Sequence, residues 1–349
     1  MSLPYRTRRK LARAGMILTA LLTVGVTAWL CWVVWLERYV VYSGSAATLD
    51  FSISAQELSG EVAQMPVAEE NVPIYYNEGS DAINISSDLT QLEGYFITND
   101  DMKTEMDSIM TTIQRLEPDT PVMLDMKGPY GSFFYNSKLE EAITSASTNI
   151  GEVEKLVEAL KKRGCYLIAR ISSLRDYNFG NNHVSSGLYM LSRAGLWMDN
   201  GYYWLDPTNA TTTSWITSVT LELKEMGFDE VLLADFRFPG GDKYIFDGDK
   251  TVALQEAANK LINACSANNF VLSFGVEDLN LELPAESRCR LYLENVDASS
   301  LESRASQAKV TDPKIQVVFV TQNNDSRYAN YSTLRSISLA DMLEAQKQN

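Results

Sequence analysis

The stretch Gly227-Phe-Asp-Glu-Val-Leu-Leu-Ala-Asp-Phe-Arg-Phe-Pro239 decides the fold of this chain. A glycine such as its first residue is typical of the position that ends a helix. The apolar run at 231–233 is typical of a parallel strand that is covered on both faces. Pro239 and the two glycines after it break the chain into a loop. The stretch therefore predicts a buried strand whose polar end carries Asp235 and Arg237.

The alternation of apolar strands and helices continues on both sides of this stretch. Further strands are predicted at 94–98, 121–127, 165–171, 270–276, 290–295 and 315–322, and helices at 100–116, 151–163, 213–226, 250–267, 299–307 and 332–348. The first of these helices is expected to be capped by Asn99 or Asp100. Seven parallel strands predict an α/β fold of the TIM-type (β/α) barrel. No eighth strand is visible, so the barrel is either incomplete or closed by an N-terminal segment.

Polar side chains follow each predicted strand at its C-terminal end. They are Asn99, Asp125 with Lys127, Arg170, Asp235 with Arg237, Glu277, Glu294 and Gln322. Each one taken alone is explained by a strand end that meets solvent, whereas the whole ring is equally consistent with a shared cleft at the barrel face that carries active sites. Residues two apart on a strand point the same way, so Asp125 and Lys127 are expected to face one cleft.

The segment 14–36 contains 23 residues without a charge, and five basic residues precede it between positions 6 and 13. At 1.5 Å per residue it reaches roughly 34 Å, enough to span a bilayer and too long for a signal-peptide core. The basic residues on one side predict a cytoplasmic N-terminus and an extracellular C-terminal part. The predicted organisation is a cytoplasmic basic tail at 1–13, a transmembrane signal anchor at 14–36, a stalk at 37–90 with a short strand at 72–76, and the barrel at 91–349.

The net charge is −15, and the chain after residue 40 holds 24 basic against 44 acidic residues. This balance is a poor match to nucleic acid or to anionic lipid. There are four cysteines, of which one lies in the segment 14–36. The other three, Cys165, Cys265 and Cys289, lie in or beside apolar runs and are expected to be buried thiols.

Carboxylate chemistry is what the residue inventory leaves open. The single histidine, His183, excludes a multi-histidine metal site, and no phosphate-binding glycine motif follows a strand, so neither metal nor cofactor is expected. A glycosidase needs two carboxyl groups across a sugar-binding cleft. Asp235 and Glu277 end consecutive strands and are candidates for such a pair.

Aromatic residues are frequent in the long loop after the third predicted strand. They are Tyr189, Trp197, Tyr202, Tyr203 and Trp204. These rings are suited to stack on sugar faces, or alternatively to form a small hydrophobic core that holds the loop together. For Trp204 the second interpretation is the favoured one.

Residues 92–241 carry several motifs in order. They are Gly94-Tyr-Phe-Ile-Thr98, Val122-Met-Leu-Asp-Met-Lys127 with Gly131 and Tyr135, Ile168-Ala-Arg-Ile171 followed by Asp176, Trp204-Leu-Asp-Pro207, Gly227-Phe-Asp-Glu230 and Arg237-Phe-Pro239. This series resembles the glycosyl hydrolase domain family of bacterial cell-surface proteins, relatives of the α-amylase-type barrels. The resemblance implies a barrel fold and a glycan as partner. Within the matching residues, the candidates for substrate binding are Lys127, Arg170, Asp176, Trp204, Asp206 and Arg237, and the catalytic candidates are Asp125 and Asp235. Their strand-end positions add Glu294 to the first group and Glu277 to the second.

The sequence departs from the family pattern at its most informative position. The family reads D-Y-V-R-F-P, with an aspartate three residues before the arginine, whereas here Ala234 holds that place and Asp235 follows it. Because one step along a strand turns a side chain to the other face, either a local bulge returns Asp235 to the cleft or the carboxylate is lost. Beyond residue 241 the match fades: Leu272 stands where an aspartate is expected, and 291–295 replaces the P-M-x-Y-P-S-H motif.

Two functions compete on this sequence, and a solute receptor or purely structural anchor is a third, less favoured alternative. The first is a membrane-anchored, extracellular glycoside hydrolase that acts on cell-envelope polysaccharide, with Asp235 as nucleophile, Arg237 as its electrostatic partner and Glu277 as proton donor. The second is a catalytically degenerate barrel that binds glycan or a protein partner at the cell surface. The hydrolase requires Glu277 to lie in an apolar setting that keeps it protonated.

Overall fold

A computed structural model describes most of the chain from residue 89 onward. The described residues are 89–265, 270–285 and 287–336, the short strands 40–43 and 46–49, and the single positions Leu22, Gly25, Val26, Trp29 and Trp32. The chain divides into two compact units, Met1–Ser80 and Asp81–Asn349. In the first unit β1 (Val40–Ser43) pairs antiparallel with β2 (Ala46–Leu49). The predicted strand at 72–76 and most of the predicted anchor at 14–36 lie outside the described residues, and none of the described helices has the length and apolarity to cross a membrane.

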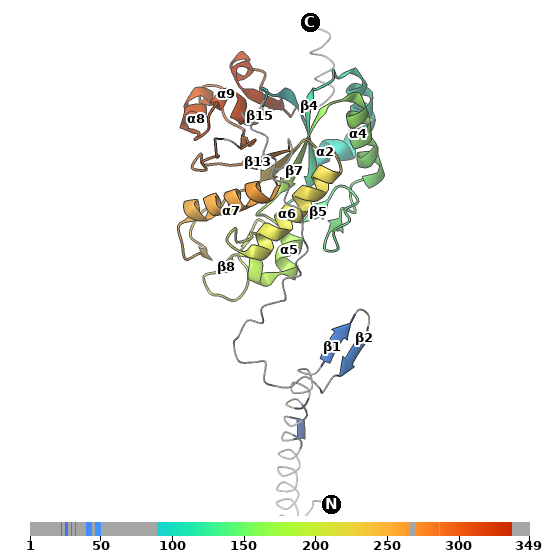
Figure 1. The fold of residues 1–349 in the computed structure, drawn as a ribbon, viewed down its shortest axis with the longest axis vertical. Coiled ribbons are helices and arrows are strands. Elements are labelled where there is room, and N and C mark those ends of the chain that lie inside the picture. Colours follow the sequence, from blue (N-terminus) through green and yellow to red (C-terminus); the bar gives the residue numbers. More distant parts are fainter. Residues whose placement is uncertain are drawn as a thin grey trace, which may run out of the picture. The chain divides into compact units, whose positions relative to one another are not determined.

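Eight parallel strands form a closed barrel in the second unit (Figure 1). They are β3 (Glu93–Ile97), β4 (Pro121–Lys127), β7 (Tyr166–Ser172), β11 (Glu230–Ala234), β13 (Val271–Gly275), β14 (Leu291–Glu294), β15 (Val317–Thr321) and β16 (Ser332–Arg335). Each strand pairs with its neighbour in this order, and β16 pairs with β3. The predicted TIM-type barrel is therefore confirmed, and it is complete.

The eighth strand, β16, corrects the prediction of a helix at 332–348. Its first two residues are Ser332 and Thr333, which are buried although they are polar. The hydroxyl of Ser332 donates to the carbonyl of Ile315 at 2.9 Å, and that of Thr333 donates to the carbonyl of Tyr328 at 3.0 Å. These tertiary hydrogen bonds compensate for the burial of the two hydroxyls. Because the strand begins with polar residues, the sequence contains no apolar run that identifies it. The remainder of the predicted helix, from residue 337 on, lies outside the described residues.

Helices and short elements connect the barrel strands, and Figure 1 shows the long helices α4, α6 and α7 on the outside of the sheet. The helices are α2 (Asn99–Thr104), α3 (Met106–Thr112), η2 (Ile113–Arg115), α4 (Ile150–Arg163), α5 (Tyr177–Asn182), η3 (Val184–Ser186), α6 (Ala210–Glu225), α7 (Lys250–Cys265), α8 (Leu301–Gln307), α9 (Pro313–Gln316) and η4 (Ser326–Asn330). The short strands are β5 (Ser132–Phe133), β6 (Ile143–Thr144), β8 (Tyr189–Met190), β9 (Met198–Asp199), β10 (Tyr202–Tyr203) and β12 (Tyr244–Ile245). The predicted end of α4 at Gly164 is confirmed, with a left-handed φ of 78°.

The helix predicted over 100–116 is two helices, α2 and α3, that meet at Glu105. Its N-cap is Thr98, whose side chain accepts from a backbone N–H of the first turn, and not Asn99 or Asp100. The prediction failed because all three residue types are good caps and sequence alone does not choose among neighbours.

Two hydrophobic clusters hold the barrel. The larger one lies between the strands and the surrounding helices and includes Cys165, Cys265 and Cys289, which are free and buried as predicted. The smaller one fills the inside of the barrel, with Leu92, Phe96, Met123, Ile168, Leu232, Tyr292, Val318, Val320 and Leu334. Because these side chains pack the lumen, the barrel has a solid floor, and a ligand has room only at its ends.

The N-terminal end of the barrel is closed by a buried polar network around Glu230, the first residue of β11. Its carboxylate accepts hydrogen bonds from the hydroxyls of Ser273 at 2.6 Å and Tyr292 at 2.7 Å. It also accepts from the hydroxyl of Tyr166 at 3.0 Å and forms an ion pair with Arg290 at 2.6 Å. Glu230 and Arg290 are both enclosed. The lumen at this end is therefore filled by the network, and we look for the functional site at the C-terminal end, where barrel enzymes place theirs.

Candidate functional site

The C-terminal ends of β7, β11, β13 and β14 surround a cavity of about 320 Å³, which we call the mouth cavity. It is lined by Arg170, Ala234, Asp235, Arg237, Gly275, Val276, Glu277, Tyr292, Leu293, Glu294, Asn295, Val296 and Arg304. This is the face at which barrel enzymes place their active sites. Of the predicted site residues, Arg170, Asp235, Arg237, Glu277 and Glu294 therefore come together around one cavity.

Arg170 crosses the top of the barrel lumen from β7. Its guanidinium forms ion pairs with Asp125 on β4 and with Glu294 on β14, each at 2.9 Å. It also lies over the ring of Phe96, 5.5 Å from the ring centroid. One arginine thus holds two of the predicted carboxylates, from strands on different sides of the barrel, and forms the floor of the mouth cavity.

Asp125 lies beneath the mouth cavity and does not line it. Its carboxylate accepts from the N–H of Asn99 at 3.0 Å in addition to its ion pair with Arg170. Burial raises the pKa of Asp125 above its ordinary value, although Arg170 and the Asn99 N–H act in the opposite direction. Because both of its oxygens accept hydrogen bonds, Asp125 serves here as an anchor for Arg170.

Asp235 lies directly after β11 in a left-handed backbone conformation, with φ of 55°. This conformation brings Asp235 to the mouth cavity beside Ala234, so the carboxylate is retained at the mouth in spite of the shifted register. Its oxygens accept from the hydroxyl of Ser172 at 2.7 Å and from Arg175 at 3.3 Å. The prediction that Arg237 is the partner of Asp235 is wrong. Because β11 ends at Ala234, the alternation of side chains along the strand does not extend to Arg237.

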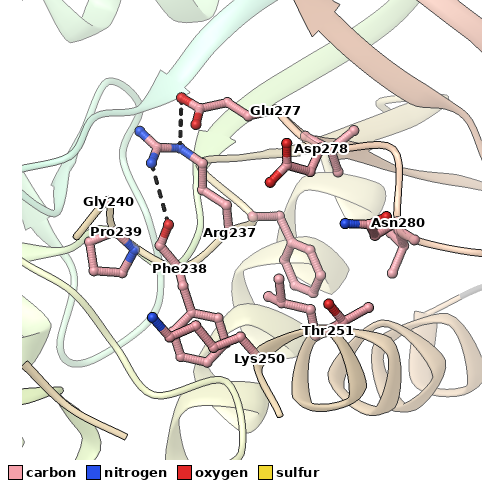
Figure 2. Close-up of a pocket in the computed structure, with 13 residues that line it drawn as sticks. Arg237, Phe238, Pro239, Gly240, Lys250, Thr251, Glu277, Asp278 and Asn280 are labelled. Carbon is pink, nitrogen blue, oxygen red and sulfur yellow. Dashed lines mark hydrogen bonds and ion pairs between the residues drawn. The ribbon is translucent and has the colours of Figure 1, made fainter. Parts of the chain in front are cut away.

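Arg237 pairs with Glu277 instead, at 3.2 Å, and a second nitrogen of its guanidinium donates to the carbonyl of Phe238 (Figure 2). The side chain of Glu277 is 70% exposed. Glu277 therefore lacks the apolar setting that the hydrolase requires, because the neighbouring Val276 does not cover its carboxylate. The pair stands at the rim of the mouth cavity.

Trp204 is completely buried beneath these arginines. Its ring lies 4.9 Å from the guanidinium carbon of Arg237 and 5.7 Å from that of Arg175. Trp204 therefore supports the partners of both Asp235 and Glu277, and the favoured prediction that it belongs to a buried core is confirmed. Trp204 positions these arginines and is not itself open to a ligand. Tyr202 is partly exposed, and its ring centroid lies 4.4 Å from the guanidinium carbon of Arg175.

Lys127 and Asp176 form a separate, buried ion pair at 2.7 Å. A register shift in β4 between Asp125 and Lys127 turns the lysine away from the mouth, so these two residues do not face one cleft as predicted. Asp176 also caps α5 and accepts from the indole N–H of Trp215 at 3.3 Å. The pair thus holds the loops after β4 and β7 together.

Asp206, a predicted site residue, and the single histidine both lie outside the lining of the mouth cavity. Asp206 accepts from the N–H and the hydroxyl of Thr208 in the turn before α6. His183 ends α5 and pairs with Glu141. Among the residues that the structure describes, no cluster of histidine, cysteine and acidic side chains is placed to hold a metal ion.

Sequence reasoning missed Ser172 and Arg175, which hold Asp235. The signal for Ser172 was available, because β7 extends to it and it shares the inward face with Arg170, two residues earlier. Arg175 comes from the irregular loop after the strand, where no periodicity applies. It also missed Arg304, which donates to the backbone carbonyl of Glu277 from α8.

A second hollow of about 260 Å³ adjoins the mouth cavity and shares Arg237, Val276 and Glu277 with it (Figure 2). We call it the side hollow. Its other lining residues are Phe236, Phe238, Pro239, Gly240, Lys250, Thr251, Leu254, Asp278, Asn280 and Leu281. It lies between the loops after β11 and β13 and the start of α7.

The chain matches one family model, and one solved structure agrees with the barrel fold. Residues 94–271 match the family described as "Putative glycosyl hydrolase domain". A hypothetical protein from Ruminiclostridium thermocellum ATCC 27405 is 20% identical with a TM-score of 0.45, over 52% of this chain and 96% of its own. A GH36 α-galactosidase from Geobacillus stearothermophilus, solved with stachyose, is 9% identical with a TM-score of 0.50, over 74% of this chain and 40% of its own. This second likeness bears on the fold alone. No curated protein sequence matches the chain.

Proposed function

We propose, since the chain belongs to this glycosyl hydrolase domain family, that its barrel mouth binds a cell-envelope glycan without hydrolysing it. One observation carries the proposal: the three carboxylates that line the mouth cavity, Asp235, Glu277 and Glu294, are each paired with an arginine. A glycosidase needs one carboxyl group that is free to pass a proton to the leaving group, whereas each of these carboxylates is already engaged by a guanidinium. The arrangement therefore favours binding over bond cleavage.

Fixed ion pairs are well suited to hold sugar hydroxyls, which both donate and accept hydrogen bonds. Carboxylate oxygens only accept and guanidinium groups only donate, so the paired groups present both functions at set positions. Beside them, Tyr130 is exposed and packs edge-on against Tyr202 with ring centroids 4.6 Å apart. Arg175 links Tyr202 to Asp235. An aromatic surface next to polar groups is the usual composition of a ligand site.

Hydrolysis is the second candidate, and the backbone of Asp235 favours it. A left-handed φ at a residue other than glycine is strained, although aspartate tolerates it better than most residues, and such strain is concentrated at functional sites. In that mechanism Asp235 is the nucleophile and Glu277 the proton donor. Glu277 would then have to leave Arg237 and take up a proton when the substrate binds.

The location that we propose is the outer face of the cell membrane, with the chain anchored through residues 14–36. The uncharged length of this segment and the basic residues before it support this topology. Protease added to intact cells should then remove the barrel and spare the N-terminal tail. Protection of the barrel in intact cells would contradict the proposed orientation.

The experiment uses the full-length chain in detergent with gluco-, galacto- and N-acetylglucosamine oligosaccharides of one to six units. Titration calorimetry should detect binding, and an assay for new reducing ends should detect none. Asp235→Asn, which keeps the size of the side chain, should weaken binding without lowering the melting temperature. If reducing ends do form and Asp235→Asn abolishes them, the hydrolase is the correct function. If no oligosaccharide binds, the proposal fails.

A further inference from the structure

We infer that the glycan site continues from the mouth cavity into the side hollow, so that its ligand is a neutral oligosaccharide of at least two units. This inference rests on the proposed function. The Arg237–Glu277 ion pair, drawn in Figure 2, lines both spaces and forms a common wall. A ligand that crosses the pair meets a hydrogen-bond donor and an acceptor at the junction.

The volumes indicate a joint site. Ligand sites in proteins measure roughly 300–1,000 Å³. The mouth cavity, at about 320 Å³, reaches the lower limit of this range, and the side hollow, at about 260 Å³, falls below it. Joined across Arg237 and Glu277, they lie well inside the range. Each space taken separately is small, whereas the joint site is long enough for successive sugar units.

The side hollow has an aromatic side that is fixed in place. The ring of Phe238 packs against Phe246 with centroids 4.5 Å apart and lies parallel to Tyr244 at 6.3 Å. The ammonium of Lys250 lies 4.7 Å from the ring centroid of Tyr244 and 6.0 Å from that of Phe238. Phe238, which is partly exposed, therefore offers an apolar ring face beside a cation, and a sugar can use the two with its own ring face and its hydroxyls.

Polar side chains whose hydrogen-bonding capacity is unused lie on both sides of the side hollow. Asp278, Asn280 and Thr251 are exposed, and within the described part of the chain their side chains form no hydrogen bond. Figure 2 shows Asp278 and Asn280 along one side of the hollow, with Lys250 and Thr251 along the other. A ligand between them meets donors and acceptors from both sides.

The charges around the side hollow balance. Lys250 and Arg237 carry positive charge, and Asp278 and Glu277 carry negative charge. An anionic ligand would be repelled by Asp278 and Glu277, and a cationic ligand would be repelled by Lys250 and Arg237. A neutral ligand with many hydroxyls satisfies all four groups, so a neutral saccharide fits better than a uronic acid or an amino sugar with a free amine.

The test compares the double variant Thr251→Ala/Asn280→Ala with wild type. Both side chains are exposed and uncharged, so the variant should fold with an unchanged melting temperature. Thr111→Ala on the outer surface of α3 is the matched control. In the full-length protein, the double variant should bind the oligosaccharides of two or more units about tenfold more weakly, as expected for two lost hydrogen bonds. Its affinity for the corresponding monosaccharides, measured by ligand-observed NMR, should equal that of wild type.

The outcomes separate the inference from the proposed function. If wild type binds none of the gluco-, galacto- or N-acetylglucosamine oligomers, the proposed function fails. If it binds them and its affinity does not rise from one unit to two, the side hollow is not part of the site. Equal affinity of the double variant and wild type for all lengths also overturns the inference, while the mouth cavity keeps its proposed role.

Discussion

The two ends of the barrel contain the same chemical pair, an arginine with a carboxylate, in opposite surroundings. At the N-terminal end Arg290 and Glu230 are at most 1% exposed, and hydroxyls occupy the remaining positions around the carboxylate. At the C-terminal end the side chain of Arg170 is 23% exposed, and that of its partner Glu294 is 42% exposed. The comparison shows that exposure, and not residue type, separates a structural ion pair from one that is available to a ligand.

The physical reason lies in desolvation. A buried charge that loses its partner is left uncompensated, whereas an exposed charge recovers water. At the N-terminal end, burial raises the pKa of Tyr292 well above its ordinary value, and the nearby Glu230 raises it further. Tyr292 is therefore a neutral hydroxyl that donates to Glu230 throughout the accessible pH range. Both carboxylate oxygens of Glu230 are thus engaged within the network.

The largest effect is expected from Arg290→Ala, which leaves Glu230 buried without its cation. The free energy of unfolding should fall by about 3–5 kcal/mol, measured by urea denaturation. The double variant Glu230→Leu/Arg290→Met removes both charges and should be more stable than either single variant. A single variant that loses less than about 1 kcal/mol would show that the network is not the structural closure that we describe.

Arg170→Ala is the matched change at the mouth, and its cost should be smaller. Asp125 and Glu294 lose a partner, but Glu294 is open to solvent, so we expect a loss of about 1–2 kcal/mol. The folded variant should bind oligosaccharide more weakly, because the floor of the mouth cavity is changed. A loss as large as that of Arg290→Ala, with glycan affinity retained, would make the mouth a second structural closure and remove the contrast between the two ends.

The fold was largely predictable from the sequence, because seven strands carry continuous apolar runs with a helix or a glycine stop between them. The eighth strand, β16, was not predictable in this way. Its residues Ser332 and Thr333 are polar, and hydrogen bonds to other elements allow them to be buried. Periodicity reports burial only where burial requires apolar side chains. A polar strand that closes a barrel is therefore hidden from this kind of analysis.

The site was predicted less well, for a related reason. Strand ends correctly identified the carboxylates at the mouth, but their partners depend on loops and bulges. The bulge in β4 removes Lys127 from the mouth, and the left-handed turn at Asp235 makes Arg175 its partner in place of Arg237. The family motifs thus divide into two groups: Lys127, Asp176 and Trp204 build the loops, whereas Asp235 and Arg237 line the cavity.

Asp125 gives a smaller, pH-dependent effect that sharpens the comparison. Its pKa in the folded protein lies above its ordinary value of 3.8. The stability that this group contributes is therefore fully present below the unfolded pKa and is lost as the pH rises through the folded pKa. As the pH rises above the ordinary pKa of 3.8, wild type should lose stability relative to Asp125→Asn, measured by urea denaturation at each pH. An opposite slope would mean that Arg170 outweighs the burial of Asp125.

The smallest effect on stability is expected from Glu277→Gln, and it tests the function most directly. Because the Glu277 carboxylate is largely exposed, the loss of its ion pair with Arg237 should change the free energy of unfolding by no more than about 0.5 kcal/mol. Glutamine keeps an oxygen that accepts hydrogen bonds but cannot donate a proton as an acid. If the mouth only binds glycan, Glu277→Gln should retain affinity within a few-fold, and neither protein should release reducing ends. If Glu277 is a proton donor, the variant should retain binding and lose turnover that wild type possesses. Such a result would show that an exposed carboxylate can leave its arginine when substrate arrives, and it would replace the binding function with the hydrolase.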